Sequence, residues 1–375
     1  EDRWIAERSH QQLPFFSTDL VQLQKGFLSL RIVDHEKYMR RCLELARKGK
    51  GRVLSNPMVG CVIVHRDKII GEGYHAVYGE AHAEVNAINF VKDESLLRES
   101  TLYVSLEPCS HHGKTPPCAD LIVGKGIPKV LIAQEDPNPR VASKGIERLR
   151  SAGIQVESGL FEEKAMELNR RFNTFHREKR PYVILKWAMS QNGIMDISRD
   201  EGQKGIYWLS SPATKKLVHK WRSEEMAILV GSRTVEIDNP RLDTRKYYGQ
   251  NPLRIVLSGK DRLPENAGVL IDDEPALIFG EIEHSGNKVE WINSEGKDAL
   301  DLLFSELYKR SVLSVLVEGG AHTINRFIES GNWDEARVIQ SNVHLPEGME
   351  APKITGSIKE EFIYAGDRIS IFRNT

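Results

Sequence analysis

The first half of the chain alternates between two spacings of its hydrophobic positions. After Asp34, apolar residues recur at helical spacing from Tyr38 to Ala46, and Gly49 and Gly51 end this run. Short apolar runs typical of strands then alternate with further helical repeats. The predicted strands are residues 58–64, 68–74, 101–105 and 130–133, and the later predicted helices are residues 81–91, 118–124 and 144–152. This alternation predicts an α/β sandwich whose sheet is parallel in part.

A charged segment separates this half from a second pattern of the same kind. Residues 161–179 repeat with helical spacing, and Pro181 closes their charged end, which favours a domain boundary near residue 180. Beyond it we predict strands at residues 182–189, 226–230, 254–257, 276–279 and 314–317, and helices at residues 212–222, 298–309 and 321–330. The predicted domains are therefore residues 34–180 and 181–375. Residues 1–33 precede them as an extension to which the sequence assigns no role.

Composition narrows the class of protein. A chain of 375 residues can hold two domains, each with its own core. The net charge of −1 provides no basic surplus for a nucleic-acid backbone, so we expect a small-molecule substrate and no nucleic acid. No apolar run approaches the ~18 residues of a membrane span, and the polar start has no signal-peptide pattern. Four cysteines suit a reducing compartment, so we expect a cytoplasmic protein with no membrane partner.

Candidate chemistry lies between His82 and Cys118. The chain reads His82-Ala83-Glu84, then Glu107-Pro108-Cys109, then Pro116-Pro117-Cys118. One imidazole and two thiols are ligands for Zn²⁺, and three protein ligands leave the fourth position open for water, as catalytic zinc requires. A glutamate two residues after the histidine can carry protons, and H-x-E followed by two cysteines is typical of zinc nucleobase deaminases. We therefore predict zinc on His82, Cys109 and Cys118, with Glu84 as general acid and base.

The second half lacks the G-x-G-x-x-G of a Rossmann dinucleotide site. It has a predicted strand that runs through Glu318, Gly319 and Gly320 into a predicted helix. Glycines at such a turn let the backbone approach a phosphate at the helix N-terminus, although a tight turn without a ligand has the same pattern. The residues alone leave both interpretations open.

Several motifs together resemble one enzyme family. The spacer between Cys109 and Cys118 is eight residues instead of the usual two, Asn56-Pro57-Met58-Val59-Gly60 precedes it, and Asp136-Pro137-Asn138-Pro139 follows. With these features the chain resembles, from about Asp34 to near its end, the bifunctional riboflavin-biosynthesis proteins, in which a pyrimidine deaminase is fused to a reductase. The resemblance implies a cytidine-deaminase-like α/β/α sandwich and a dihydrofolate-reductase-like α/β domain. It also implies a homo-oligomer, a dimer or a tetramer.

The resemblance implies two successive reactions on a phosphorylated ribosylaminopyrimidine. Zinc-dependent hydrolysis would remove the 2-amino group of 2,5-diamino-6-ribosylamino-4(3H)-pyrimidinone 5′-phosphate, and NADPH would then reduce the ribosyl group to ribityl. In the deaminase half, Asn56 and His75 would contact the substrate. The residues implied to meet NADPH are Ala188, Trp208, Thr234, Asp238, Gly320, Ala321, His322 and Thr323. Those implied to meet the reductase substrate are Arg222, Leu242, Arg245 and Glu318.

Some positions depart from the family pattern. Ile206 stands where many relatives have a substrate-binding serine, Gly259 where a cofactor-binding serine is common, and Gln191-Asn192-Gly193 where Leu-Asp-Gly is usual. His111, His112 and Lys114 in the long spacer fit a phosphate-binding rim or a solvated loop equally well. Ser232, Arg233 and Arg326 could hold the 2′-phosphate that distinguishes NADPH from NADH.

Two other functions fit parts of the pattern. A nucleoside or tRNA deaminase with a non-catalytic C-terminal domain would use the same ligands, but the long spacer and the balanced charge argue against it. A catalytically silent assembly or ligand-sensing protein would keep the fold alone. The complete set of His82, Glu84, Cys109 and Cys118 argues against that alternative for the first half only.

Overall fold

The computed structural model describes residues 34–110, 116–139 and 141–374. The predictions for residues 1–33 and for His111, His112 and Lys114 lie outside these residues. Backbone contacts divide the chain into residues 1–34 and residues 35–375, and every contact discussed below lies within the second group. None of the described helices is long and apolar enough to cross a membrane.

The first sheet has five strands in the order β2-β1-β3-β4-β5. β1 pairs antiparallel with β2 and β3, whereas β3, β4 and β5 run parallel. Their bounds are β1 Gly60–His65, β2 Lys68–Tyr74, β3 Thr101–Leu106, β4 Lys129–Gln134 and β5 Gln155–Ser158. Because β1, β3 and β4 are buried along nearly their whole length, both faces of this sheet need a cover.

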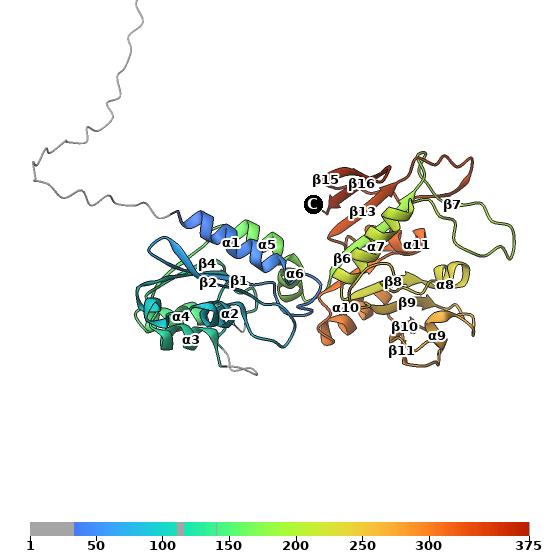
Figure 1. The fold of residues 1–375 in the computed structure, drawn as a ribbon. Helices are drawn as coiled ribbons and strands as arrows, with labels where there is room; N and C mark the ends of the chain where they lie inside the picture. The colour runs from blue at the N-terminus through green and yellow to red at the C-terminus, as the bar shows by residue number, and fades with distance from the viewer. Residues whose placement is uncertain (1–33, 111–115, 140, 375) are drawn as a thin grey trace, which may run out of the picture. The chain divides into compact units, whose positions relative to one another are not determined.

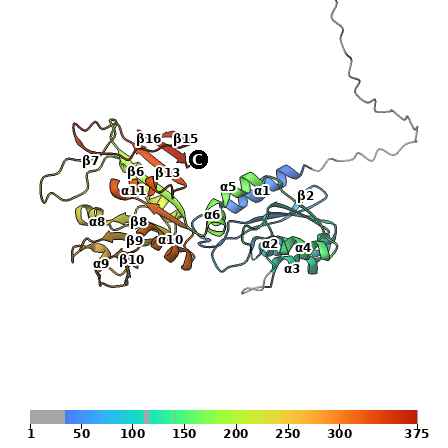
Figure 2. The same ribbon diagram turned by 180° about the vertical axis from the view of Figure 1, so that it is seen from behind.

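Helices supply that cover on the two faces. α2, α3 and α4 pack with Cys61, Ile63 and their neighbours, and α1 and α5 pack with Val62, Val64 and theirs (Figures 1 and 2). The elements are α1 His35–Arg47, α2 Ala83–Phe90, the 3₁₀ helix η1 Glu94–Glu99, α3 Cys118–Lys125, α4 Lys144–Ser151, α5 Glu162–Leu168 and α6 Arg170–Glu178. Alternate residues of one strand thus belong to different cores, as the period of a strand requires. The predicted α/β/α sandwich is confirmed.

The second sheet has nine strands in the order β11-β10-β9-β8-β12-β6-β13-β16-β15. All neighbours from β11 to β13 are parallel, and β16 and β15 add an antiparallel edge. The strands are β6 Tyr182–Met189, β8 Ala227–Gly231, β9 Leu253–Gly259, β10 Ala276–Gly280, β11 Val289–Asn293, β12 Ser314–Val317, β13 Glu335–Gln340, β15 Ser357–Tyr364 and β16 Asp367–Arg373. A separate pair joins β7 Ile194–Ile197 to β14 Gly348–Glu350.

Helices again cover both faces. α10 Ala299–Lys309 and α11 Ala321–Glu329 pack on one face, around Leu303 and Phe327. α7 Pro212–Glu224, α8 Ser232–Asp238 and α9 Gly268–Ile271 pack on the other. α7 begins where Ser211 Oγ accepts a hydrogen bond from Thr214 N at 3.2 Å, with Pro212 in the first turn. This is a second α/β domain of the predicted class.

The helix predicted over residues 161–179 is broken into α5 and α6. Asn169, between them, turns its side chain to the backbone of Met58: Oδ1 accepts from Met58 N at 2.8 Å, and Nδ2 donates to Met58 O at 3.0 Å. An asparagine that bonds elsewhere in this way competes with helix formation. These two hydrogen bonds matter for the site, because they hold Met58 and with it the loop that carries Asn56.

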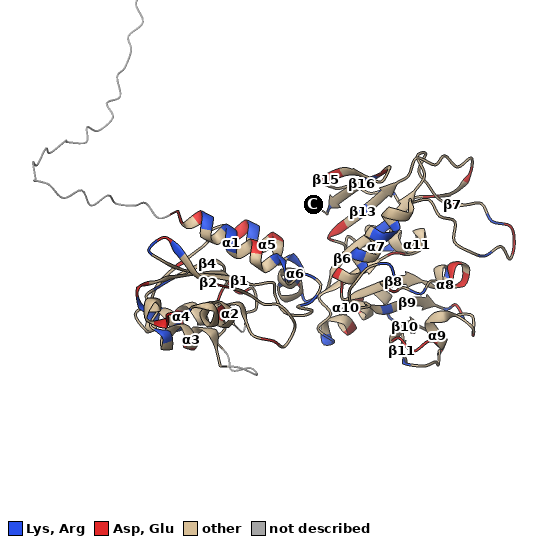
Figure 3. Ribbon diagram, viewed as in Figure 1, with Lys and Arg blue, Asp and Glu red and all other residues tan. Residues whose placement is uncertain are grey.

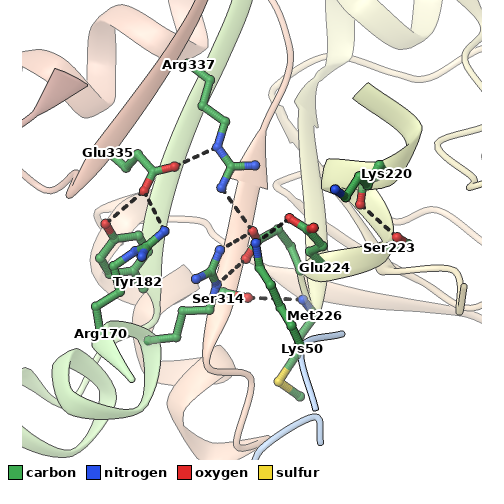
Figure 4. A network of polar contacts seen from close by, with 12 residues as sticks. Lys50, Arg170, Tyr182, Lys220, Ser223, Glu224, Met226, Ser314, Glu335 and Arg337 are labelled. Atoms are coloured by element: carbon green, nitrogen blue, oxygen red, sulfur yellow. Dashed lines mark hydrogen bonds and ion pairs between the residues drawn. The ribbon is translucent and has the colours of Figure 1, made fainter. Parts of the chain in front are cut away.

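A buried ionic network joins α6 to the second sheet. Glu335, on β13, accepts hydrogen bonds from Arg337, Arg170 and Tyr182 (Figure 4). Arg171 and Arg337 both pair with Glu225, which follows α7. The two arginines outweigh the penalty of burial and lower the pKa of Glu225 to about 2. Removing one charged partner from such a network leaves another buried and unpaired.

Candidate active sites

The predicted metal ligands come together at one edge of the first sheet. His82 immediately precedes α2, Cys109 follows β3, and Cys118 is the first residue of α3. His82 Nδ1 lies 3.6 Å from Cys109 Sγ and 3.3 Å from Cys118 Sγ, and the three ligand atoms lie within 4.8 Å of one another. Sequence segments far apart are joined here because β3 ends next to the start of two helices.

This geometry fits a zinc ion. With bonds of about 2.0–2.3 Å, a tetrahedral zinc sets neighbouring N and S ligand atoms roughly 3.5 Å apart. The N–H of Cys118 donates to Cys109 Sγ at 3.3 Å. Hydrogen bonds from Cys118 and His82 lower the pKa of Cys109 to about 4, although burial opposes the shift. The hydrogen bond with Cys109, and then burial, raise the pKa of Cys118, so Cys109 is the more readily ionised thiol of the pair, and the thiolate is the form of cysteine that binds metal.

Glu84 lies in the first turn of α2, beside the ligand group, and is only 3% exposed. Burial, and secondarily the Cys109 thiolate, raise the pKa of Glu84 to about 7. A carboxyl group with a pKa near neutrality can both accept and release a proton at physiological pH.

Asn56 and His75 meet on the side of this group. Asn56 Nδ2 lies 3.0 Å from His75 Nε2, and His75 Nδ1 lies 3.1 Å from Ala81 O. Since a carbonyl can only accept, His75 donates from Nδ1 and accepts the Asn56 amide at Nε2. The His75 ring stands edge-on to His82, with centroids 5.5 Å apart. The structure thus brings both predicted substrate residues to the metal group.

Most of the predicted reductase residues line two adjoining cavities of the second domain, which share Ile206, Thr234 and Asp238. The first, of about 300 Å³, includes Gly320 and Ala321 and is called the glycine-turn cavity. The second, of about 170 Å³, is called the basic cavity. Its lining includes Trp208, Leu242, Glu318 and the basic residues Lys186, Lys215, Arg222, Arg241, Arg245 and Lys246.

Glu318 is the buried acid of the basic cavity. Arg222 donates two hydrogen bonds to its carboxylate, from Nε to Oε1 at 2.7 Å and from Nη2 to Oε2 at 2.8 Å. Lys186 Nζ lies 3.4 Å from Oε2. Burial opposes ionisation of Glu318, but Arg222 and Lys186 overcome it and lower its pKa to about 2. Glu318 is therefore a permanent anion at neutral pH.

Comparisons with known proteins agree for both halves. Residues 32–134 match the cytidine and deoxycytidylate deaminase zinc-binding region, and residues 181–359 match the RibD C-terminal domain. The riboflavin biosynthesis protein RibD of Bacillus amyloliquefaciens is 42% identical over 311 residues, which are 80% of this chain and 82% of that protein. The chain belongs to the RibD family.

Solved structures of the family have the same architecture. The deaminase/reductase from Thermotoga maritima matches with a TM-score of 0.80 and 34% identity, covering 91% of this chain and 98% of that one. The RibD of Acinetobacter baumannii matches with a TM-score of 0.82, 31% identity and the same coverage. Both structural matches cover the first and the second domain of this chain. The second half is therefore a RibD reductase domain and not an unrelated domain.

Some predicted cofactor residues stand apart from the cavities. Ala188, His322 and Thr323 are not among the described residues that line either one. Thr323 instead packs against Gly231, where an added Cβ would lie 2.5 Å from its Oγ1. Trp208 lines the basic cavity, whereas Arg233 lines the glycine-turn cavity. The roles that the resemblance implies for these residues remain predictions.

Two of the three departures from the family pattern have local explanations, and that of Ile206 has none. Ile206 lines both cavities without a hydroxyl to offer. Gly259 has a φ of +56°, a conformation in which a side chain is disfavoured. Asn192 Oδ1 accepts from Ser190 Oγ at 2.8 Å, and its amide donates to Leu345 O at 2.7 Å, so the substituted turn is held by its own bonds.

Sequence reasoning missed Lys186 and Glu107. Lys186 is the one charged residue in the otherwise apolar β6, which was the available signal. Glu107 is 4% exposed and accepts hydrogen bonds from the backbone N–H groups of Asp136, Ser143, Gly145 and Ile146. It therefore clamps the residues around the Asp136-Pro137-Asn138-Pro139 motif against the end of β3. Gly145 is required there, since a Cβ would lie 2.0 Å from Pro108 O.

Proposed function

We propose that the chain is a bifunctional riboflavin-biosynthesis enzyme with a zinc-dependent deaminase at residues 34–180 and an NADPH-dependent reductase at residues 181–375. Its substrate would be 2,5-diamino-6-ribosylamino-4(3H)-pyrimidinone 5′-phosphate. The observation that carries the proposal is the group of His82, Cys109 and Cys118 around the buried Glu84. In the same chain, a second domain holds two cavities that meet at Asp238.

In the deaminase, His82, Cys109 and Cys118 would hold the zinc, which when bound supplies Lewis acidity and lowers the pKa of water. Glu84 takes a proton from the attacking water and delivers it to the ring nitrogen. It then takes the proton of the new hydroxyl group on the ring carbon and delivers it to the amino group, which leaves as ammonia while the carbonyl forms. Its pKa of about 7 suits both transfers. His75 orients the Asn56 side chain. The Asn56 amide would form a hydrogen bond with the edge of the pyrimidine and so hold the carbon that carries the 2-amino group near Glu84.

In the reductase, NADPH when bound would supply a hydride to the sugar carbon bonded to the amine, as the bond from that carbon to the ring oxygen breaks and a proton from solvent completes the new hydroxyl group. The glycine-turn cavity would take the cofactor, because Gly320, at φ +66°, lines this cavity and immediately precedes α11, where the helix N-terminus favours a phosphate. The Glu318 carboxylate, held ionised by Arg222 and Lys186, would accept hydrogen bonds from the sugar hydroxyls. Asp238 lines both cavities and would lie where cofactor and sugar meet.

A cytoplasmic location and a homo-oligomeric state complete the proposal. The four cysteines are all free thiols in the structure, which suits a reducing compartment. We propose a dimer or a tetramer on the family resemblance alone.

Two assays on one purified protein test the function. With the diamino substrate we expect release of one ammonia per molecule without NADPH. With the product of that step we expect NADPH consumption, followed as the fall in absorbance at 340 nm. A protein that releases no ammonia, or that consumes no NADPH with the deaminated compound, lacks the corresponding half of the proposed activity.

A further inference from the structure

The loop that carries Asn56 contacts the reductase domain. This loop, residues 49–58, lies between α1 and β1 and is called the Asn56 loop. Asn56 and Met58 line a cavity of about 100 Å³. The same cavity is lined by Glu225 and Met226, which follow α7 in the second half of the chain. The space beside a residue expected to contact the deaminase substrate is therefore lined in part by the reductase domain.

Two glycines of the Asn56 loop make close backbone contacts. An added Cβ at Gly49 would lie 2.7 Å from the carbonyl oxygen of His75. At Gly51, where φ is +74°, an added Cβ would lie 2.8 Å from the carbonyl oxygen of Ser223, near the end of α7. Contacts this short leave no room for a side chain. The loop backbone is therefore packed against His75 of the deaminase and against α7 of the reductase.

Lys50, between these glycines, forms an ion pair with the reductase domain. Lysine and arginine recur along α7 in Figure 3, whereas its last residue, Glu224, is acidic. Lys50 Nζ lies 2.8 Å from Glu224 Oε2 (Figure 4). The Glu224 side chain is 11% exposed and that of Lys50 is 40% exposed, so we expect the pair to make a modest contribution. It joins the loop to the same helix end that Gly51 contacts.

Apolar contacts reach a second segment of the deaminase site. Leu106, at the end of β3, and Phe172, on α6, belong to one buried cluster with Leu313 of the second half. Val59, which follows the Asn56 loop, packs against this cluster. The chain continues from Leu106 directly to the metal ligand Cys109. Residues of the reductase domain therefore support both the segment that carries Asn56 and the segment that leads to Cys109.

We propose that Ser223 and Glu224, in the reductase domain, are positioning residues for deamination. Neither would touch the substrate. They would hold the Asn56 loop, Ser223 through its carbonyl group and Glu224 through its ion pair, so that Asn56 meets the pyrimidine. This inference rests on the proposed deaminase function and deepens it.

The expected kinetic effect follows from the place of Asn56. Its amide would contact the substrate both before and during the reaction, so a displaced loop removes the same interaction from both states. Such a loss raises KM and leaves kcat nearly unchanged. A loss of folded or zinc-loaded enzyme would instead lower kcat and leave KM unchanged, so the two kinetic constants separate positioning from a general loss of structure.

A double-mutant cycle on the full-length, zinc-loaded protein tests the ion pair. Lys50→Met and Glu224→Gln should each raise the KM for the diamino substrate about threefold, as expected for one partly exposed ion pair. The double variant should also show about a threefold increase and not about a ninefold one, because both changes remove the same contact. Glu306→Gln is the matched control, since it breaks another pair of the reductase domain, with Lys309 at 2.8 Å, and should change nothing.

Gly51→Ala tests the close backbone contact. The added methyl group meets the carbonyl oxygen of Ser223, so the loop must move and KM should rise about tenfold. Gly153→Ala is its control, because Gly153 also has a positive φ, +82°, but an added Cβ would meet no atom of the described residues within 4 Å. Both variants should lose similar stability through backbone strain, and KM should rise in Gly51→Ala alone.

Hydrogen exchange followed by mass spectrometry measures the Asn56 loop without any substrate. Its amides should exchange faster in Glu224→Gln than in the unmodified protein, and at the unmodified rate in Glu306→Gln. The proposal is wrong if Glu224→Gln leaves KM or the exchange rates unchanged, or if the effects of Lys50→Met and Glu224→Gln multiply. If the unmodified protein releases no ammonia, the proposed deaminase is refuted, and hydrogen exchange alone then decides whether Glu224 holds the loop.

Discussion

The ion pair of Arg222 and Glu318 allows a quantitative prediction about stability. Their side chains are 13% and 6% exposed, so solvent screens the pair little. Arg222 and Lys186 outweigh burial and lower the pKa of Glu318 from 4.5 to about 2. At 1.36 kcal/mol per pKa unit, this corresponds to about 3 kcal/mol of stabilisation of the carboxylate. Arg222→Met should reduce the free energy of unfolding by about 3 kcal/mol or more at pH 7, because it removes the largest favourable charge and leaves the burial cost of Glu318 opposed by Lys186 alone.

The pH dependence has a defined sign. In the unmodified protein the folded pKa of Glu318 lies below its unfolded value. The pair therefore stabilises the fold above about pH 4.5, and this contribution is lost as the pH falls toward 2. In Arg222→Met burial without the arginine raises the pKa of Glu318, so protonation relieves the buried charge. The deficit of the variant should therefore shrink between pH 7 and pH 4.

Urea unfolding followed by tryptophan fluorescence measures this effect. Five of the six tryptophans, Trp187, Trp208, Trp221, Trp291 and Trp333, lie in the second half, so the signal reports on that half. The decisive comparison is the double variant Arg222→Met with Glu318→Gln, which should recover most of the lost stability because no lone carboxylate remains. A double variant no more stable than Arg222→Met refutes the reasoning. Arg326→Met, which breaks an exposed pair with Asp298, is the control and should cost less than about 1 kcal/mol.

Three further predictions concern the two reactions. Protein purified without chelator should hold one zinc per chain by metal analysis, and replacing any of the three ligands should lower the metal content and the stability of the first domain. Glu84→Gln should retain zinc but slow ammonia release by ~10²-fold or more. Its NADPH oxidation with the deaminated substrate should be unchanged, and a variant that deaminates normally would contradict the role of Glu84. Fluorescence titration should give a lower Kd for NADPH than for NADH, and Arg233→Gln, at the glycine-turn cavity, should narrow the difference; equal affinities in the unmodified protein would count against the prediction.

The fold was predictable wherever a strand or helix has an unbroken pattern. β6 has the predicted bounds because it is apolar except for Lys186. β13 was missed because Glu335 and Arg337 interrupt its pattern, and their burial becomes acceptable only through contacts with each other and with distant residues such as Glu225. β15 was missed for the opposite reason, since nearly all of its residues are exposed and no apolar alternation marks it.

The two sites also differed in how far the sequence could predict them. The zinc ligands lie in short motifs whose spacing is characteristic, so the sequence predicted the set. The wall of the basic cavity depends on strand order and register: β12 pairs with β6 so that Val317 lies opposite Leu185, and the next residues, Glu318 and Lys186, then meet. Register of this kind could not be read from the sequence, because β6 and β12 are apolar on both faces and have no alternation that would fix it.

Glu84 and Glu318 show how the environment of a carboxylate assigns its role. Both are buried, and burial alone raises the pKa of each. Glu84 has the Cys109 thiolate beside it, which adds to the effect of burial, so its pKa reaches about 7 and it can exchange protons at neutral pH. Glu318 has Arg222 and Lys186, which reverse the effect, so its pKa falls to about 2 and it stays an acceptor. In the proposed enzyme, deprotonation of the attacking water needs a group that accepts and releases a proton. The sugar hydroxyls instead need a hydrogen-bond acceptor that stays charged. The opposite signs of the two shifts match these opposite needs.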